Sequence, residues 1–319
     1  MQIISDCTLD AIKASARALK AGNLVAFPTE TVYGLGADAT NEKAVSRIYL
    51  VKNRPINHPL IVHISSANKL RTWSDKIPNY AFDLAKAFWP GPMTLILPKT
   101  NLVKNYLTGG QNNIALRVPY HQIALELLMQ FEKIGGVGVA APSANRFGAV
   151  SPTNAGAVYE ELGDYCSPND VLLDGGRCKI GLESTIIDCT QPRPRVLRPG
   201  AITNEMIELH SNSKIDTTNF VSSTIASGML RSHYSPRAKV VLNTLAKAGE
   251  GFIALAKVPT PIGAIRLGTP KTNEEFAQQI YELLRLGDAN GLPTICVILP
   301  EDGALHDAIA DRMSKAAQD

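Results

Sequence analysis

The sequence predicts an α/β fold, with one large domain over residues 1–208 and a smaller α/β unit over residues 239–319. In the first part, continuously apolar strand candidates alternate with helical patterns, which is typical of a sheet buried on both faces. A stretch rich in Ser, Thr and Asn then shows no clear period and is predicted to be a linker over residues 209–238. The unit that follows has about 80 residues, near the lower size at which a core stabilises itself.

The N-terminal segment predicts an amphipathic helix that ends at Gly22. Asp6 and Asp10 stand where a signal peptide would be apolar. The apolar side chains that share one face of this helix are Leu9, Ile12, Ala16 and Leu19.

Strands and helices follow in an order that suits an α/β domain. The strands predicted in the large domain are residues 23–27, 59–64, 93–97, 113–118, 136–141, 171–173, 184–188 and 195–198. The helices predicted between them are residues 42–51, 78–88, 120–134 and 153–162. In the small unit, strands are expected at residues 239–243, 251–257 and 294–300, and helices at residues 273–291 and 304–317.

Composition excludes several classes of protein. A formal charge of +3 is too small to indicate nucleic-acid binding by itself, and no apolar run approaches the length of a membrane span. The cysteines are odd in number, scattered and without a CxxC pair, so we expect free thiols and a cytoplasmic protein with no membrane association. These cysteines are Cys7, Cys166, Cys178, Cys189 and Cys296.

The segment PTETVYGLGADAT, residues 28–40, follows an apolar strand and contains a nominal dinucleotide fingerprint, G-x-G-x-x-A. The first glycine lies too far from the strand, and no acid stands about 20 residues on, so this interpretation is rejected. The plainer interpretation is a glycine turn before a helix capped by Thr40 or Asn41. Thr29, Glu30 and Thr31 nevertheless crowd a strand end, where open α/β sheets bind ligands, and they suit a small ligand with an amine and a hydroxyl.

Two further segments offer groups for an anion. In KNRPINHPLIVHI, residues 52–64, both Lys52 and Arg54 could bind the same polyanion. A solvated basic turn is the more frequent structure for such a segment. In AAPSANRFGAVSPT, residues 140–153, short donors on a loop shaped by Pro and Gly suit phosphate or ribose, and a turn that caps the next helix at Thr153 is about equally frequent.

Arg117 ends an otherwise apolar strand, so it needs either a structural carboxylate or a ligand anion as its partner. The segment GLESTIID places Glu183, Ser184 and Thr185 at a strand start, and Arg198 follows in RVLRPG. No GxSxG, Walker lysine or HExxH motif occurs. His58 and His63 flank a strand without Cys or Asp neighbours, so they do not indicate a metal cage.

In their order and spacing, these segments, with WPGPMTLIL and GMLRSHYSPRAKV, resemble the YrdC-like family in its long form, the threonylcarbamoyl-AMP synthases with an added domain. The resemblance covers nearly the whole chain. It implies a twisted open mixed sheet with flanking helices, and a smaller Rossmann-like α/β domain joined by a long linker. It also implies a cytoplasmic nucleotidyltransferase that converts L-threonine, bicarbonate and ATP into L-threonylcarbamoyl-AMP and diphosphate, the first step of the tRNA threonylcarbamoyladenosine modification.

The resemblance also implies roles for individual residues. Lys52 and Arg54 match the catalytic pair. The residues that match the threonine site are Thr31, His63, Arg117, Ala141 and Ser184. Those that match ATP contacts are Lys52, Arg54, His58, Asn113, Ser143, Asn145, Ser151, Arg198 and Tyr234, where His58 stands in place of the Asn of many relatives and Asn113 in place of the Thr of some.

Nucleotidyl transfer needs mainly neutralisation of charge and alignment, so no nucleophilic side chain is required. The expected cofactor is Mg²⁺ bound through the ATP phosphates, with no metal cage built by the protein. Glu30 is a weak candidate for the base that deprotonates the threonine amine. The expected partners besides the substrates are the complex that transfers threonylcarbamoyl to tRNA, which takes up the product, and a weak contact with tRNA.

Two alternatives from other classes remain. One is a non-catalytic RNA-binding module, which would be expected to carry more charge or an aromatic stacking motif. The other is a carbamoyltransferase that handles carbamoyl adenylate, which would be expected to carry a further catalytic domain. Within the linker, Tyr234 is expected to reach the nucleotide as part of a lid, with Arg231 or Arg237 adding charge; a simple tether is the plainer interpretation.

Overall fold

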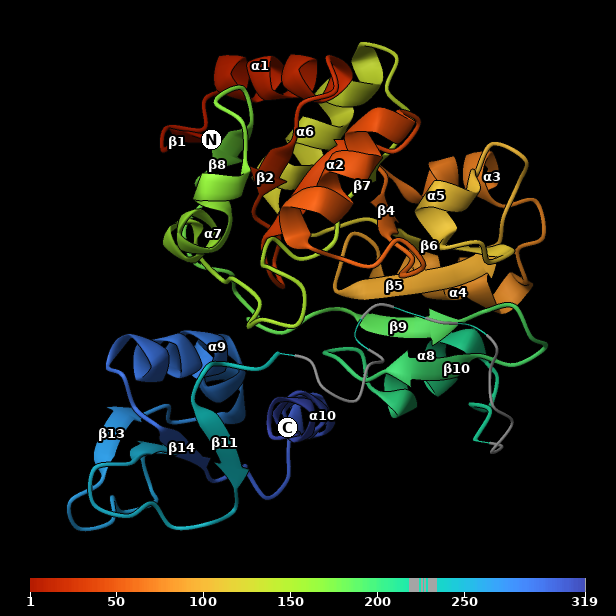
Figure 1. Ribbon diagram of the computed structural model, residues 1–319. Helices are drawn as coiled ribbons and strands as arrows, with labels where there is room; N and C mark the ends of the chain where they lie inside the picture. The colour runs from red at the N-terminus through yellow and green to blue at the C-terminus, as the bar shows by residue number, and fades with distance from the viewer. Residues whose placement is uncertain (218–223, 225, 227, 229–233, 319) are drawn as a thin grey trace.

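The chain forms a ten-stranded mixed sheet and then a four-stranded sheet (Figure 1). The computed structural model describes residues 1–217, 224, 226, 228 and 234–318. The strands of the large sheet are β1 (Gln2–Ile4), β2 (Val25–Phe27), β3 (Gly34–Asp38), β4 (Ile61–His63), β5 (Met93–Pro98), β6 (Asn113–Arg117), β7 (Val139–Ala140), β8 (Val171–Leu173), β9 (Thr185–Asp188) and β10 (Arg195–Arg198). Their order is β1-β8-β2-β3-β7-β4-β6-β5-β9-β10, with both parallel and antiparallel pairs, so the expected mixed sheet is confirmed.

Every strand predicted for the large domain is present, but β1 and β3 were not predicted. The segment 34–38 was interpreted as a glycine turn, and this was wrong. Gly36 lies in β3 opposite Val25, where a Cβ atom would approach Val139 Cγ1 to 2.8 Å. The glycine therefore serves close packing between neighbouring strands and not a turn. The predicted helix cap is confirmed at Asn41, whose side chain accepts a hydrogen bond from the Ala44 N–H.

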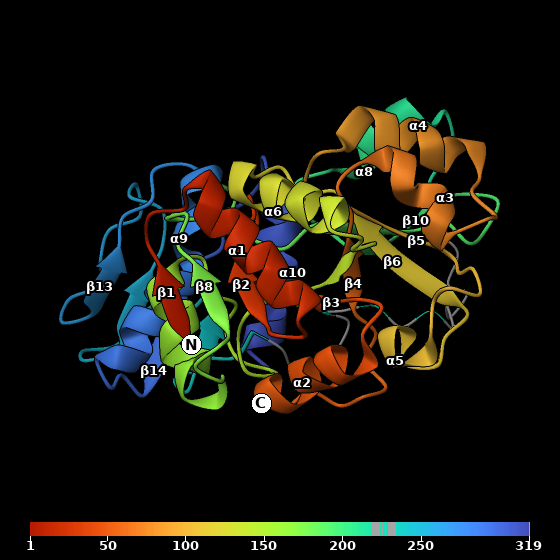
Figure 2. The ribbon, with the colours of Figure 1, turned by 90° about the horizontal axis from the view of Figure 1, so that it is seen from above.

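Helices flank both faces of the large sheet. On β2, Val25 and Phe27 pack with α1 and α6, while Leu24 and Ala26 face the opposite way, into the core that includes α2, α4 and α7. Figure 2 shows α1 and α6 side by side. The helices are α1 (Leu9–Lys20), α2 (Glu42–Lys52), η1 (Ala67–Lys69), α3 (Leu70–Trp73), α4 (Asn79–Phe88), α5 (Asn105–Thr108), α6 (Gln122–Lys133), α7 (Ala155–Leu162), η2 (Gly163–Tyr165) and α8 (Asn204–Ser211).

Three local expectations were wrong. Leu9 was expected on the buried face of the first helix but is 49% exposed, because it occupies the first turn, beyond the contact with α6. The cap of α7 is Asn154, whose side chain accepts from the Ala157 N–H, and not Thr153. The helix α8 extends to Ser211, into the segment predicted as linker, and its cap is Thr203.

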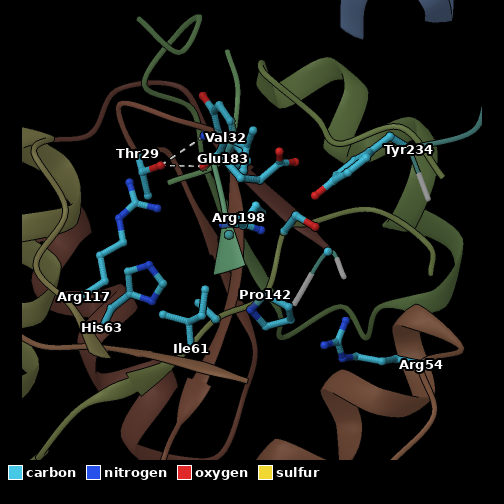
Figure 3. A pocket seen from close by; sticks show the side chains of 15 residues that line it. Thr29, Val32, Arg54, Ile61, His63, Arg117, Pro142, Glu183, Arg198 and Tyr234 are labelled. Carbon is cyan, nitrogen blue, oxygen red and sulfur yellow. Dashed lines mark hydrogen bonds between the residues drawn. The ribbon is translucent and has the colours of Figure 1, made fainter. Parts of the chain in front are cut away.

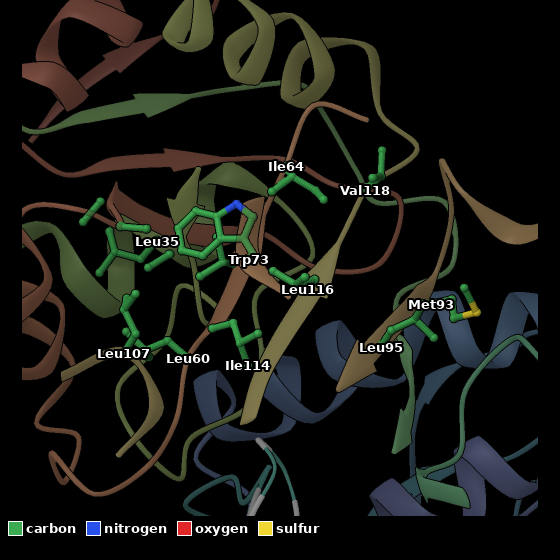
Figure 4. Close-up of a cluster of buried hydrophobic side chains, with 14 of the residues drawn as sticks. Leu35, Leu60, Ile64, Trp73, Met93, Leu95, Leu107, Ile114, Leu116 and Val118 are labelled. Carbon is green, nitrogen blue, oxygen red and sulfur yellow. The ribbon is translucent and has the colours of Figure 1, made fainter. Parts of the chain in front are cut away.

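In the region of β4, β6, β5 and β9, the two faces of the sheet carry different clusters of side chains. Leu95, Leu116 and Met93 point into the core on one face, which also holds Trp73 (Figure 4). On the other face, Ile61, Ile96 and Ile186 form a small cluster with Ala226 of the linker. Because side chains alternate along a strand, this second face receives His63 and Arg117, which are paired residues of β4 and β6.

The second sheet has the order β11-β14-β12-β13, and all of its strand pairs are parallel. Its core includes Val32, Val150 and Leu182 of the large unit as well as Tyr234 of the linker, so the two units share buried apolar contacts. The strand β13 was not predicted. The elements are β11 (Lys239–Leu242), β12 (Gly251–Ile253), β13 (Ile265–Gly268), α9 (Asn273–Ala289), β14 (Thr294–Val297) and α10 (His306–Ala316).

Candidate active site

A cavity of about 50 Å³ opens on the face of the sheet that carries His63 and Arg117 (Figure 3). It lies where β4, β6 and the start of β9 meet the loops after β2 and β7, so the side chains converge from distant parts of the chain. The residues that line it are Thr29, Val32, Tyr33, Gly34, Arg54, Ile61, His63, Arg117, Ala141, Pro142, Ser143, Glu183, Arg198, Gly228 and Tyr234.

The turn after β2 forms a chain of hydroxyl hydrogen bonds. Thr29 Oγ1 donates to the Val32 carbonyl at 2.6 Å and lies 2.9 Å from Thr31 Oγ1. Arg117 Nη2 in turn donates to Thr31 Oγ1 at 2.8 Å. Thr31 itself is fully buried behind the cavity, and the hydroxyl of this turn that reaches the cavity wall is that of Thr29, which the sequence placed at the same strand end.

Arg117 has a structural carboxylate partner, which decides between the two alternatives that the sequence left open. Its Nη2 lies 2.8 Å from Glu30 Oε1, and both side chains are buried. Glu30 Oε2 accepts from the Tyr120 backbone N–H at 3.0 Å. Glu30 is thus held by one ion pair and one backbone hydrogen bond, a geometry that orients Arg117 and does not support a role for Glu30 as a mobile base. Among the described residues, Arg117 Nε has no hydrogen-bond partner, and this side chain lines the cavity.

His63 is a neutral hydrogen-bonding group at the same end. Burial, with the charge of Arg117 acting in the same direction, lowers its pKa to about 3. Its ring packs edge-on to Phe27 at 5.8 Å, and Nδ1 has no partner within the described part of the chain. His63, Arg117 and Ala141 therefore form one end of the cavity, which we call the half-apolar end. It combines apolar surface with N–H and ring-nitrogen groups that can form hydrogen bonds with a small polar ligand.

Lys52 and Arg54 are not a solvated basic turn. Lys52 is the last residue of α2 and is buried, and its Nζ donates to the carbonyls of Ser143, at 2.6 Å, and Asn145. Burial lowers the pKa of Lys52 well below its usual value, and the charge of Arg54 acts in the same direction. Arg54 lines the cavity and donates from Nη2 to the Pro59 carbonyl at 2.8 Å; burial lowers its pKa to about 10.

The Ser143–Asn145 loop is fixed from several sides. The Ala144 N–H donates to the Tyr33 carbonyl at 2.8 Å. Asn145 Nδ2 donates to the carbonyls of Arg146 and Ala149, and its Oδ1 has no partner among the residues described. Ser143 lies at the cavity, whereas Asn145 and Ser151 are buried behind it.

Arg198, the last residue of β10, lines the cavity, and Ser184, just before β9, is buried behind it. Arg198 donates from Nε to the Ser184 carbonyl at 3.0 Å and from Nη2 to Ser184 Oγ at 3.1 Å. Ser184 Oγ also lies 2.7 Å from Thr94 Oγ1. Ser184 therefore acts on the cavity only through its hydrogen bonds with Arg198. Burial lowers the pKa of Arg198.

Tyr234 comes from the linker and closes the cavity on the side of the second unit (Figure 3). It is buried, and its backbone has a left-handed φ of 63°. Its ring stacks on Tyr281 at 5.7 Å. Arg231, named with it in the sequence as part of a lid, lies outside the described residues. Arg237 lies near Asp288 of α9, away from the cavity, and its backbone N–H donates to Asp288 Oδ2 at 2.9 Å.

Besides Lys52, Asn145 and Ser151, which are buried and do not line the cavity, two further residues expected at the nucleotide lie outside it. His58 packs on Phe147, with ring centroids 5.1 Å apart, and is partly exposed. Asn113 lines a second, separate pocket with Ile61, where its Nδ2 donates to Thr224 Oγ1 of the linker at 3.4 Å. Thr224 and Ala226 of the linker line this second pocket together with Asn113.

Glu183 is the site residue that sequence reasoning left without a role. The signal was a lone acid at the start of an apolar strand, which requires a partner when buried. Burial opposes ionisation of Glu183, but the charges of Arg312 and Arg198 outweigh it and hold its pKa at about 2. Arg312 is more than a hundred residues away in sequence, so no local pattern could have indicated this pair.

Other features of the chain bear on cofactors and membranes. Within the described ranges, no three His, Cys, Asp or Glu side chains gather in a way that could hold a metal ion. None of the helices among the described residues is long and apolar enough to cross a bilayer. The five cysteines are free thiols.

A mixed sheet with a cavity lined by buried cations and hydroxyls is typical of an α/β protein that binds a small polar ligand. A family profile named for Sua5, YciO and YrdC and described as "Telomere recombination" matches residues 17–200. A second profile, described as "Threonylcarbamoyl-AMP synthase, C-terminal domain", matches residues 202–318. The chain therefore belongs to the Sua5/YrdC family, in the long form that carries the Sua5 C-terminal domain.

Relatives of the whole chain support this membership. The threonylcarbamoyl-AMP synthase of Pyrococcus abyssi is 39% identical and aligned over 96% of this chain and 94% of its own. The threonylcarbamoyl-AMP synthase of Bacillus subtilis is 36% identical over 96% of this chain and 92% of its own. The crystal structure of P. abyssi Sua5 complexed with L-threonine superposes with a TM-score of 0.87 and 36% identity, covering 99% of this chain and 97% of that one.

Proposed function

We propose that this protein makes L-threonylcarbamoyl-AMP from L-threonine, bicarbonate and ATP, with release of diphosphate, as the first step of the tRNA threonylcarbamoyladenosine modification. Relatives named threonylcarbamoyl-AMP synthase align with almost the whole chain, and the P. abyssi relative has been crystallised with L-threonine. The observation that carries the proposal is one cavity that combines a half-apolar end, at His63 and Arg117, with buried cations at Arg54 and Arg198.

The half-apolar end suits threonine. Arg117 Nε can donate to the substrate carboxylate, while Glu30 fixes the guanidinium from the other side. His63 stays neutral, so it can accept a hydrogen bond from the substrate without competing for its carboxylate. Ala141 adds apolar surface for the methyl group. Thr31 and Ser184 remain part of this proposed site, through their hydrogen bonds to Arg117 and Arg198.

The cationic end suits the phosphates of ATP. In nucleotidyl transfer the protein mainly neutralises charge that develops on the leaving diphosphate, and buried cations do this strongly. Arg54 and Arg198 line the cavity with Ser143. As an ammonium, Lys52 has three donors, of which two go to carbonyls of the Ser143–Asn145 loop, so a third can reach a phosphate. The remaining nucleotide contacts expected from the family are His58, Asn113, Asn145, Ser151 and Tyr234.

Mg²⁺ belongs to the proposal as a cofactor that enters with ATP. The lining residues fit this, because the wall supplies cations and neutral donors and a single carboxylate, Glu183, which is already paired with Arg312. A magnesium ion that keeps its waters and binds substrate phosphates needs no protein cage. It would supply further neutralisation of the phosphate charge.

Entry of ATP requires the linker to move. A cavity of about 50 Å³ holds only a few water molecules. Gly228 and Tyr234 of the linker form part of its wall, and Thr224 and Ala226 cover the neighbouring sheet face. We therefore propose that residues 209–238 act as a lid that opens for ATP and closes over the mixed anhydride, which water would otherwise hydrolyse. The proposal places the enzyme in the cytoplasm, with its product passed to the tRNA-modifying transfer complex.

Diphosphate release from ATP, measured with and without L-threonine and bicarbonate, tests the proposed function. We expect release to require both, and we expect L-valine to replace L-threonine poorly, because a site with buried hydrogen-bonding groups rejects an analogue without the hydroxyl. Equal rates with valine would contradict the threonine site. Binding of RNA without any diphosphate release would favour the RNA-binding module, and release that depends on carbamoyl phosphate would favour the carbamoyltransferase.

A further inference from the structure

The second unit reaches the wall of the active site through one buried arginine. Arg312 lies on α10 and is completely buried. Its Nε lies 2.9 Å from Glu183 Oε2, and its Nη2 donates to the Glu183 carbonyl at 3.3 Å. Its Nη1 donates to the Pro199 carbonyl at 2.9 Å, next to Arg198. One guanidinium therefore holds the segments that begin β9 and end β10.

A tyrosine of the second unit completes this contact. Tyr281 lies on α9, and its hydroxyl donates to Glu183 Oε2 at 3.0 Å. The ring of Tyr281 stacks on Tyr234, with an interplanar angle of 22°, and the Arg312 guanidinium lies 5.6 Å from the centre of the Tyr234 ring. Glu183 and Tyr234 both line the cavity (Figure 3). The groups that position both wall residues therefore come from the second unit.

The chemistry of these contacts gives them a defined geometry. A guanidinium is a planar fork whose donors point in fixed directions, and here it serves the carboxylates of Glu183 and Asp311 and two backbone carbonyls at once. A lysine at this position would carry the same positive charge but would lack the planar fork of N–H donors. Glu183 cannot turn away without losing both the Arg312 guanidinium and the Tyr281 hydroxyl as partners of its buried carboxylate, which is strongly unfavourable. The side chains are thus held in one arrangement as long as the second unit is docked.

We propose that Arg312 and Tyr281 are positioning residues of the active site, which fix Glu183 and Tyr234 as the ATP-facing wall, so that the C-terminal unit completes the catalytic site. The inference rests on the proposed function, since it takes the Arg198 and Tyr234 side as the nucleotide end. The threonine end at Arg117 and His63 makes no contact with Arg312 or Tyr281 among the hydrogen bonds and ion pairs of the described residues. Loss of the contact should therefore affect ATP more than threonine.

The test uses the full chain and the double variant Glu183→Gln/Arg312→Met, which removes both buried charges together and so leaves neither unpaired. We expect its KM for ATP to rise about ten-fold or more, the usual effect of losing hydrogen bonds to a charged group, while its KM for L-threonine changes little. Arg312→Lys should retain charge compensation and still show a raised KM for ATP, because it lacks the fork. A double variant with the thermal stability and the KM for ATP of the wild type would overturn the inference.

Arg177→Gln is the matched control. Arg177 forms an ion pair with Glu282 of α9 at 2.5 Å, so it also joins the two units, but it is half exposed and lies outside the cavity. We expect this variant to keep both KM values. If it raises the KM for ATP as much as the double variant does, docking in general and not the Arg312 contact is responsible, and the inference is wrong.

A second variant serves if the double variant does not fold. Tyr281→Phe removes only the hydroxyl that donates to Glu183 and keeps the ring that stacks on Tyr234. We expect a smaller rise in the KM for ATP, about three-fold or more, and an unchanged KM for ATP would overturn the inference. Equilibrium dialysis with ATP alone separates this inference from the proposed function. A wild type that binds ATP but releases no diphosphate contradicts the proposed function, and ATP binding by the variants still tests the contact.

Discussion

At the scale of single residues, burial changes the electrostatic effect of charged side chains. The sequence of Lys52 and Arg54 is typical of a basic turn, yet both side chains are buried, and Lys52 donates to the Ser143 carbonyl. Their charges therefore act in a medium where water does not screen them, which strengthens their effect on a polyanion. The same burial means that neither side chain can be removed without structural consequences.

We predict that Arg54→Ala lowers turnover about 10²–10³-fold, the usual effect of removing one donor to developing charge. Lys52→Ala should lower turnover by a similar factor and should also lower the melting temperature, because the carbonyls of Ser143 and Asn145 lose their donor. Diphosphate release and thermal unfolding measure the two effects. Turnover near that of the wild type in Arg54→Ala would contradict its role at the phosphates.

His63 gives a prediction about pH. Its pKa is about 3 in the folded protein, against an ordinary value of 6.5, so below pH 6.5 the unfolded chain takes up the proton first. Stability should be unaffected by this residue above pH 6.5 and should fall as the pH decreases toward 3, by up to about 1.4 kcal/mol per pH unit. Denaturant unfolding at several pH values should show a steeper loss for the wild type than for His63→Gln. Parallel curves for the two proteins would contradict the buried neutral imidazole.

At the scale of elements, the linker is the segment for which composition predicted no helix or strand, although some of its residues lie at the active site. It lacks the apolar period of a helix or strand, yet Ala226 packs on Ile61 and Ile186, and Tyr234 enters the cavity wall. A polar segment with a few apolar or aromatic anchors can dock on a sheet face and still leave it, because little area is buried per residue.

We predict that ATP and L-threonine together protect the linker from protease cleavage at Arg231, which lies outside the described residues. Tyr234→Ala should lower activity or release more of the hydrolysed product, because the lid would close less tightly over the anhydride. The measurement is the cleavage rate at Arg231 with and without both ligands, with cleavage elsewhere in the chain as the internal reference. Equal rates, together with wild-type behaviour of Tyr234→Ala, would mean that the segment is only a tether.

At the scale of the whole molecule, the two units do not have separate interiors. Val32 and Leu182 of the large unit belong to the same buried cluster as Phe276 and Ile309 of the small one. A unit of about 80 residues has only a small core of its own, so packing against the large unit contributes much of its stability. The interface also carries the buried pair of Arg312 and Glu183.

We therefore predict one cooperative thermal transition for the full chain in calorimetry. Leu182→Ala should shift this transition as a whole to lower temperature, since truncation of a buried leucine removes about 2–5 kcal/mol of stability. Leu209→Ala, in α8, is the matched control, because that side chain is 76% exposed. A separate early transition for the small unit in the wild type would show that the units unfold independently.

The sequence by itself determined the class of fold and most of its elements. Apolar runs such as 93–97 and 171–173 predict buried strands because a strand covered on both faces needs no polar side. The period of residues 9–20 predicts α1 for the corresponding reason in helices. The ordered set of motifs indicated the family, which the profile matches over residues 17–200 and 202–318 confirm.

Only the tertiary structure decided how these residues work together. It paired Arg117 with Glu30, buried Lys52, and separated Asn113 from the cavity, because each of these outcomes depends on which strand faces which loop. It made Gly36 a strand residue because Val139 and Phe27 leave no room for a Cβ atom. The contact of Arg312 with Glu183 spans more than a hundred residues, and local sequence patterns hold information only about near neighbours. Pairing across such a distance is set by the docking of whole units, which is a property of the folded chain.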